Sequence, residues 1–196
     1  DRSARLYTAT PDFSPLYPTS GAHQYMAQLL ALERQIAQPQ QSFVALHPPM
    51  ASVTLPTRHV DQEALKVLLH AIAENAMVRA SYQSISRDEP PQRNISPHAF
   101  GYDGARWHVR AYCHLRGGFR DFILGRLRTI ELAGPSAIKA QDDTEWHTMV
   151  SLQLTAHPAL SASQRHGVEI DYGMQGGTVA LDCRQAMLYY TLRALN

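Results

Sequence analysis

Residues 102–126 read YDGARWHVRAYCHLRGGFRDFILGR, and this stretch decides the fold. It contains two turn signals, Asp-Gly at 103–104 and Gly-Gly at 117–118, which are typical of β-hairpins. Between the turns, residues 105–114 alternate in character, and a period of two predicts a strand with two different faces. The stretch therefore predicts consecutive antiparallel strands over residues 105–114 and 119–124.

The 105–114 strand has one set of side chains for a core and one polar set. The first set is expected to face inward, with the tryptophan as a buried ring: Ala105, Trp107, Val109, Ala111 and Cys113. The second set is expected to form an outward row: Arg106, His108, Arg110, Tyr112 and His114. A neighbouring strand ~5 Å away would bring Arg120, Phe122 or Arg126 beside this row.

This polar row suggests a binding site for an anion with a planar part. Guanidinium groups bind phosphate and carboxylate through a rigid fork, and aromatic rings stack on bases. The row therefore predicts contact with a nucleotide or a short single-stranded nucleic acid. An ordinary solvated face of a small barrel is the alternative explanation of the same spacing.

Patterns on both sides of this stretch extend the fold. Apolar spacing predicts helices over residues 21–37 and 62–76, the second with Asp61 as its N-cap. Alternating runs predict further strands over 78–86, 94–101 and 127–132. The C-terminal part is expected to hold these elements: a strand over 148–155, a short helix from Ser161, a hairpin of 168–172 with 178–183, and a helix from Gln185.

This order of elements predicts an α+β protein with three parts. Residues 1–60 are expected to form a linker with helical structure, and residues 61–133 a small β-barrel. Residues 145–196 are expected to form a compact α/β module. Neither the first nor the last part offers a self-sufficient core, so we expect a homodimer in which one or both cross between subunits.

Composition narrows the class of protein. The chain has 196 residues, of which 44% are hydrophobic and 18% charged, so it is expected to fold. A net charge of +1 argues against a basic nucleic-acid coat. No apolar run approaches a membrane span and no signal peptide opens the chain, so we expect a cytoplasmic protein. Cys113 and Cys183 are expected to be buried free thiols. The sequence carries none of the phosphate-loop, serine-hydrolase or zinc-protease motifs, so we expect neither an enzyme nor a metal or cofactor site.

Several motifs in the central region resemble the WYL domain of bacterial transcription regulators. Trp107-His108-Val109 stands where that family has its Trp-Tyr-Leu tripeptide, preceded by Ile95-Ser96-Pro97-His98. Phe119–Phe122 and Gly125-Arg126-Leu127 resemble the strands that follow in the family. The likeness is strongest over residues 78–131. Residues 5–18 and 150–195 are similar to the linker and C-terminal extension of WYL regulators of phage-defence operons.

The resemblance implies a fold, a site and a role. It implies an SH3-like or Sm-like barrel, a homodimer, and a winged helix-turn-helix that binds operator DNA and is missing from this chain. It implies that the barrel senses a nucleotide or nucleic-acid ligand through residues that map onto Tyr82, Ser84, Arg110, His114, Phe122 and Arg126. With the other members of the row and its neighbour, the expected ligand contacts also include His108, Tyr112 and Arg120. The alternative is a dimerisation module that binds no ligand.

Overall fold

The structure is a computed structural model that describes residues 21–42, 46–54, 58–85 and 91–195, together with residues 10, 12, 44 and 56. The chain divides into two compact units, Asp1–Thr57 and Arg58–Asn196, which are described separately. None of the helices in the described parts is long and apolar enough to cross a membrane.

The first unit is built around one helix. Helix α1 spans Ala22–Glu33 and is followed by a short 3-10 turn, η1, at Pro39–Gln41. The Tyr25 hydroxyl donates a hydrogen bond to the Leu46 carbonyl at 2.8 Å, so the chain after the turn folds back along the helix. The helix predicted over 21–37 is therefore confirmed, although it ends earlier.

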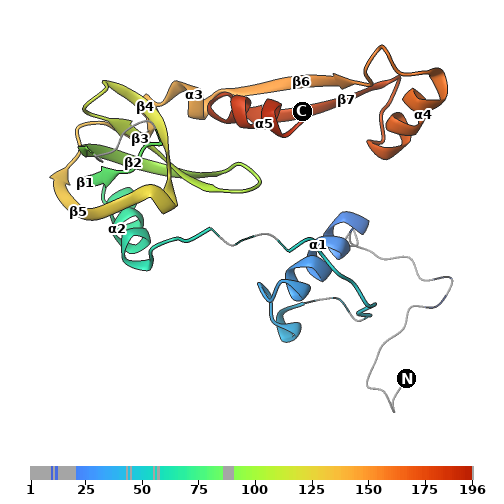
Figure 1. Cartoon of the computed structure of the whole chain (residues 1–196), viewed down its shortest axis with the longest axis horizontal. Helices are drawn as coiled ribbons and strands as arrows, with labels where there is room; N and C mark the ends of the chain where they lie inside the picture. Colours follow the sequence, from blue (N-terminus) through green and yellow to red (C-terminus); the bar gives the residue numbers. More distant parts are fainter. Residues whose placement is uncertain are drawn as a thin grey trace. The chain divides into compact units, whose positions relative to one another are not determined.

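The second unit begins with helix α2, which leads into a five-stranded sheet (Figure 1). Asp61 caps α2, Gln62–Ala73, because its carboxylate accepts a hydrogen bond from the Ala64 backbone N–H at 2.7 Å. The strands are β1 Ala76–Tyr82, β2 Gln92–Tyr102, β3 Trp107–Cys113, β4 Gly118–Ile123 and β5 Leu127–Pro135. They pair antiparallel in the order β4-β3-β2-β1-β5, with the 3-10 turn η2, Leu124–Arg126, between the two edge strands. The described strands form an antiparallel sheet whose edge strands are not paired with each other, so the predicted closed barrel is not found.

The core lies between α2 and one face of this sheet. Leu68 of α2 is fully buried together with Val78, Ile95 and Val109 from three neighbouring strands. Burying such a side chain contributes ~1.5–3 kcal/mol, so this layer is the main source of stability. On β3, the inward direction predicted for Val109, Ala111 and Cys113 is confirmed.

Trp107 is an exception, and the prediction that its ring is buried in the core is wrong. Trp107 is 49% exposed and is the first residue of β3, outside the buried cluster that Val109, Ala111 and Cys113 join. Its Cα partner in the sheet is Tyr102, and the two rings lie 4.9 Å apart at 40°. The two rings form an aromatic pair on the surface and are not part of the core.

The C-terminal part contains a second, two-stranded sheet. Strand β6, Met149–Thr155, pairs antiparallel with β7, Thr178–Arg184. Short helices flank the pair: α3 Thr144–His147, α4 Ala162–Asp171, and α5 Leu188–Ala194 after the 3-10 turn η4, Gln185–Met187. The strand predicted over 168–172 is wrong. Those residues continue α4, which a capping box between Ser161 and Gln164 starts, and β7 pairs with β6 instead.

This C-terminal sheet buries little by itself. Along β6, half-buried residues alternate with exposed ones, and no residue of α4 or α5 is buried. Large apolar side chains remain exposed there: Met149, Ile170, Tyr172, Tyr189, Leu192 and Leu195. A two-stranded sheet is marginal alone, and apolar surface of this kind marks a protein interface.

Candidate functional site

Arg110 of β3 lies at the centre of a buried ion cluster. The residue is only 4% exposed. The guanidinium donates to both carboxylate oxygens of Asp143, with Nε 2.6 Å from Oδ2 and Nη2 3.0 Å from Oδ1. It also donates to Glu145 at 2.7 Å and to Asp121 of β4 at 3.4 Å. One arginine therefore joins the sheet to the segment that leads into β6.

Burial and the neighbouring charges shift the pKa values of the ionisable groups in this cluster in different directions. Burial tends to raise the pKa of Asp143, but hydrogen bonds from Arg110 and His98 outweigh it and lower the pKa. For Asp121 burial prevails over the attraction of Arg110 and raises the pKa. Burial also lowers the pKa of His98, although its ring donates to Asp143 at 2.9 Å. The cluster thus holds more carboxylates than cations, and losing the arginine would leave buried negative charge unpaired.

A second set of contacts holds helix α5 against the same face of the sheet. The His108 ring donates to Asp103 at 2.9 Å and lies 4.7 Å from the Tyr190 ring of α5. The Tyr190 hydroxyl donates to Asp121 at 3.3 Å. Burial tends to raise the pKa of Asp103, but hydrogen bonds from His108 and from the turn backbone hold it at about 2. The polar face of β3 is therefore linked to the C-terminal part at two places.

These contacts correct the prediction of an outward row on β3. His108 is 2% exposed, and Arg110 is buried as well, because the segment before β6 and helix α5 cover this face. Tyr112 is half-buried against the rings of His114 and Phe119. His114 alone in this group is exposed, with its ring hydrogen-bonded to Ser96. Whether these residues contact a ligand stays a prediction.

The neighbours of the row also differ from the prediction. The sheet pairs Arg110 with Asp121, so Arg120 and Phe122 point to the other face of β4. Arg120 is exposed, whereas Phe122 is buried in the core with its ring edge-on to Tyr82 at 5.2 Å. The Tyr82 hydroxyl accepts a hydrogen bond from the Ile123 backbone. The remaining two predicted residues are half-buried, Ser84 just beyond β1 and Arg126 in η2.

The acidic partners of the row were missed from the sequence. They are Asp103, Asp121, Asp143 and Glu145, with Tyr190 as a further contact. A signal for Asp121 existed, because one register of the hairpin places it opposite Arg110. Asp143 and Glu145 lie more than 30 residues from Arg110 along the chain, and no local pattern connects them.

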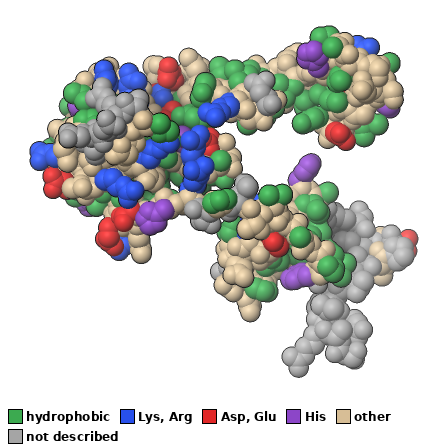
Figure 2. Space-filling view, in the orientation of Figure 1, with side chains coloured by type: hydrophobic (Ala, Val, Ile, Leu, Met, Phe, Trp, Pro, Cys, Tyr) green, Lys and Arg blue, Asp and Glu red, His purple; other side chains and the backbone are tan. Residues whose placement is uncertain are grey.

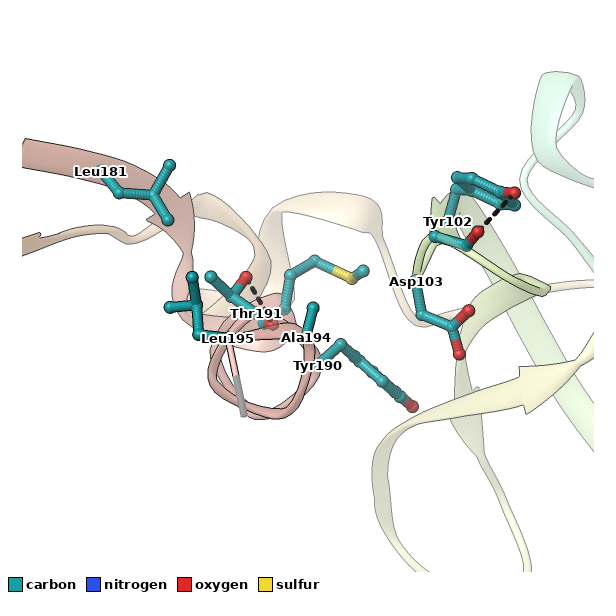
Figure 3. Close-up of a pocket in the computed structure, with 9 residues that line it drawn as sticks. Tyr102, Asp103, Leu181, Tyr190, Thr191, Ala194 and Leu195 are labelled. Atoms are coloured by element: carbon teal, nitrogen blue, oxygen red, sulfur yellow. Dashed lines mark hydrogen bonds between the residues drawn. The ribbon is translucent and has the colours of Figure 1, made fainter. Parts of the chain in front are cut away.

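A pocket of about 280 Å³ lies where the five-stranded sheet meets the C-terminal part. Figure 3 shows Tyr102 and Asp103 on one side and Leu181, Thr191 and Leu195 on the other. Met187 reaches this wall at Gly101, where an added Cβ would lie 2.9 Å from the Met187 sulfur. The pocket therefore lies between β2 of the five-stranded sheet and the α5 region of the C-terminal part.

Comparison with known families assigns the two parts. Residues 63–132 match the WYL domain, and residues 149–196 match the BrxR transcriptional regulator C-terminal dimerization domain. The whole chain aligns with a DNA-binding transcriptional repressor CapW of Stenotrophomonas maltophilia at 43% identity. The chain belongs to the WYL-domain regulators. A CapW repressor of Pseudomonas aeruginosa also aligns over the whole chain, at 40% identity.

The chain spans 66% of the length of each of these CapW relatives. A structure of the proteasome accessory factor B/C (PafBC) of Arthrobacter aurescens shares 23% identity over 68% of this chain and 24% of its own, with a TM-score of 0.36. The families that match are a regulatory and a dimerization domain, in agreement with the prediction that the chain is not an enzyme. The buried cluster therefore joins the WYL domain to the segment directly before the dimerization domain.

Proposed function

We propose that this chain is the sensing and dimerization region of a transcriptional repressor. In this proposal the WYL domain, residues 61–133, binds a nucleotide or a short single-stranded nucleic acid. Binding changes how a winged helix-turn-helix outside these 196 residues holds operator DNA, in the cytoplasm and within a phage-defence operon. Support comes from the repressor name of relatives that align with the whole chain.

The buried cluster around Arg110 is the observation that carries the proposal. Arg110 belongs to β3 of the WYL domain, and Asp143 and Glu145 lie just before the first strand of the dimerization domain. Because the carboxylates meet a single guanidinium, a ligand that shifts β3 or competes for this cation shifts their segment as well. A ligand changes an equilibrium only through different affinities for two states, and in this proposal the cluster is intact in one state and broken in the other.

The dimerization domain supplies the second half of the proposal. Its exposed apolar residues, such as Met149 and Leu192, are available to a second copy of the chain. We propose that two chains associate through residues 145–196 to form a homodimer. Tyr190 of this domain hydrogen-bonds to Asp121 of the WYL domain, so the position of the dimer interface depends on the sensing face.

A pair of adjacent tyrosines tests this coupling in the intact repressor. Tyr190→Phe removes the hydroxyl that bonds Asp121 but keeps the ring beside His108. Tyr189→Phe removes a hydroxyl from a mostly exposed neighbour and serves as the matched control. We expect Tyr190→Phe to change operator affinity, or its response to ligand, at least fivefold, which is ordinary for coupled sites. Equal operator binding by both variants and the unaltered protein would argue against coupling through this contact.

A ligand-free dimerization module is the second candidate, and one observation favours it. The cations of the polar row are already satisfied by protein carboxylates, as in a purely structural joint. Thermal shift separates the two functions, because a ligand that binds only the native state raises the melting temperature. Short oligonucleotides and nucleotides that leave the melting temperature unchanged at millimolar concentration would favour the structural module.

A further inference from the structure

A second pocket, of about 210 Å³, lies at the edge of the WYL domain away from the ion cluster. Three segments line it: Arg58–Val60, Arg106-Trp107 and Ile123–Arg126. The lining includes three arginines and His59 but no acidic side chain. Figure 2 shows Lys and Arg side chains, with some acidic ones, on the visible face of this domain.

Two of the three arginines have no acidic partner in the part of the chain that the structure describes. Arg106 lies 3.2 Å from Asp103, which His108 also contacts. Arg58 and Arg126 form no ion pair with any described residue. This differs from Arg110, whose charge Asp143, Asp121 and Glu145 balance, so the pocket holds two guanidinium charges that no described acidic side chain balances.

Trp107 gives this pocket an aromatic wall. Its indole is half exposed and backed by the Tyr102 ring at 4.9 Å. A large apolar ring left in solvent beside unpaired guanidiniums has no role in the core. Arginines next to an exposed ring are the combination that binds phosphate and stacks a neighbouring base.

The pocket is also held in shape by the backbone. A Cβ added at Gly125 would lie 2.5 Å from the carbonyl oxygen of His59, which is closer than any real contact. Only glycine therefore lets the 58–60 segment pack directly on η2. This close approach fixes the 58–60 wall of the pocket against η2.

We propose that this pocket binds a phosphate group whose neighbouring base stacks on Trp107. The inference rests on the proposed sensing function and locates its ligand. Pockets for whole drug-sized ligands measure ~300–1,000 Å³, so this smaller one suits a single phosphate and its sugar, with the base outside on the indole. Both a free nucleotide and the phosphorylated end of a single strand present this chemistry.

Binding of three probes to the chain tests the proposal: dTMP, pentathymidylate with a 5′-phosphate, and pentathymidylate without it. Competition against a fluorescent phosphorylated pentamer gives each affinity. We expect a 5′-phosphate to increase the affinity of the pentamer at least tenfold. If dTMP competes as well as that pentamer, the ligand is a free nucleotide; if only the pentamer competes, the ligand is a strand end.

Charge variants locate the site. Arg126→Gln and Arg58→Gln should each weaken binding of the phosphorylated pentamer at least tenfold, and each lost contact should reduce the salt dependence, d log K/d log[salt], by ~0.7. Arg128→Gln removes the same charge two residues away, on the exposed side of β5, and should bind like the unaltered protein. Gly125→Ala keeps every charge but displaces the 58–60 segment, and should weaken the same probe.

Equal affinities for the two pentamers, or equal effects of the Arg126 and Arg128 variants, would overturn the proposal. Failure of this site is distinguishable from failure of the sensing function. Oligonucleotide binding that depends on Arg110 and ignores Arg58 and Arg126 would place the ligand at the ion cluster. If none of the probes binds, the proposed phosphate site is overturned. The proposed coupling through Tyr190 would still be tested separately by operator binding.

Discussion

Replacing Arg110 with methionine tests whether the buried ion cluster stabilises the fold. Methionine keeps much of the volume but leaves Asp143, almost completely buried, without its guanidinium. Removing one partner of a buried pair costs ~3–5 kcal/mol, because the other charge stays buried and unpaired. At ~2–4 °C per kcal/mol for a chain of this size, the melting temperature should fall by roughly 6–20 °C.

Two further variants make this result specific. Arg128→Met changes an exposed arginine and should stay within about 0.5 kcal/mol of the unaltered protein. Asp143→Asn removes the charge but keeps the oxygen that accepts from the Trp146 backbone N–H. Combined with Arg110→Met, it should cost ~0.5–3 kcal/mol less than the sum of the single changes. A free energy of unfolding for Arg110→Met that equals that of the Arg128 variant would refute the reasoning.

Three other changes probe the core, the surface tryptophan and the pH dependence. Leu68→Ala should lower the free energy of unfolding by ~2–5 kcal/mol in urea titrations, whereas Leu69→Ala, at a mostly exposed position of the same helix, should cost far less. Trp107→Ala should lower the free energy of unfolding by about 1 kcal/mol, the scale of one aromatic contact. A decrease of several kcal/mol would show that the ring belongs to the core. Burial lowers the pKa of His98 in the folded state, so the unfolded state binds more protons below its ordinary pKa of 6.5 and stability should fall as the pH drops from 7.5 to 5.5. His98→Gln should show a shallower fall in melting temperature over this range; an unchanged slope would assign the effect to another group.

Local patterns were sufficient for the order of the elements in the WYL domain. The Asp61 cap, the apolar face with Leu68, and the two hairpin turns each depend on a few neighbouring residues, and the structure confirms them. The strand predicted over 168–172 failed because its apolar residues, Val168 and Ile170, fit a strand or a helix equally well over so short a run. The capping box that begins at Ser161 decided in favour of the helix.

The candidate site was less predictable, because its character depends on one residue of register and on a distant segment. In the observed β3–β4 pairing Asp121 lies opposite Arg110 and forms an ion pair with it, whereas a shift by one residue would place Arg120 there and give a cationic row. Like charges directly opposite each other are unfavourable, so charge alone favours the observed register. Because Asp143 also covers the row, the charge of Arg110 is balanced by the protein's own carboxylates. In the pocket at η2, Arg58 and Arg126 pair with no acidic side chain among the described residues, and neither belongs to the alternating row on β3 that first suggested a site.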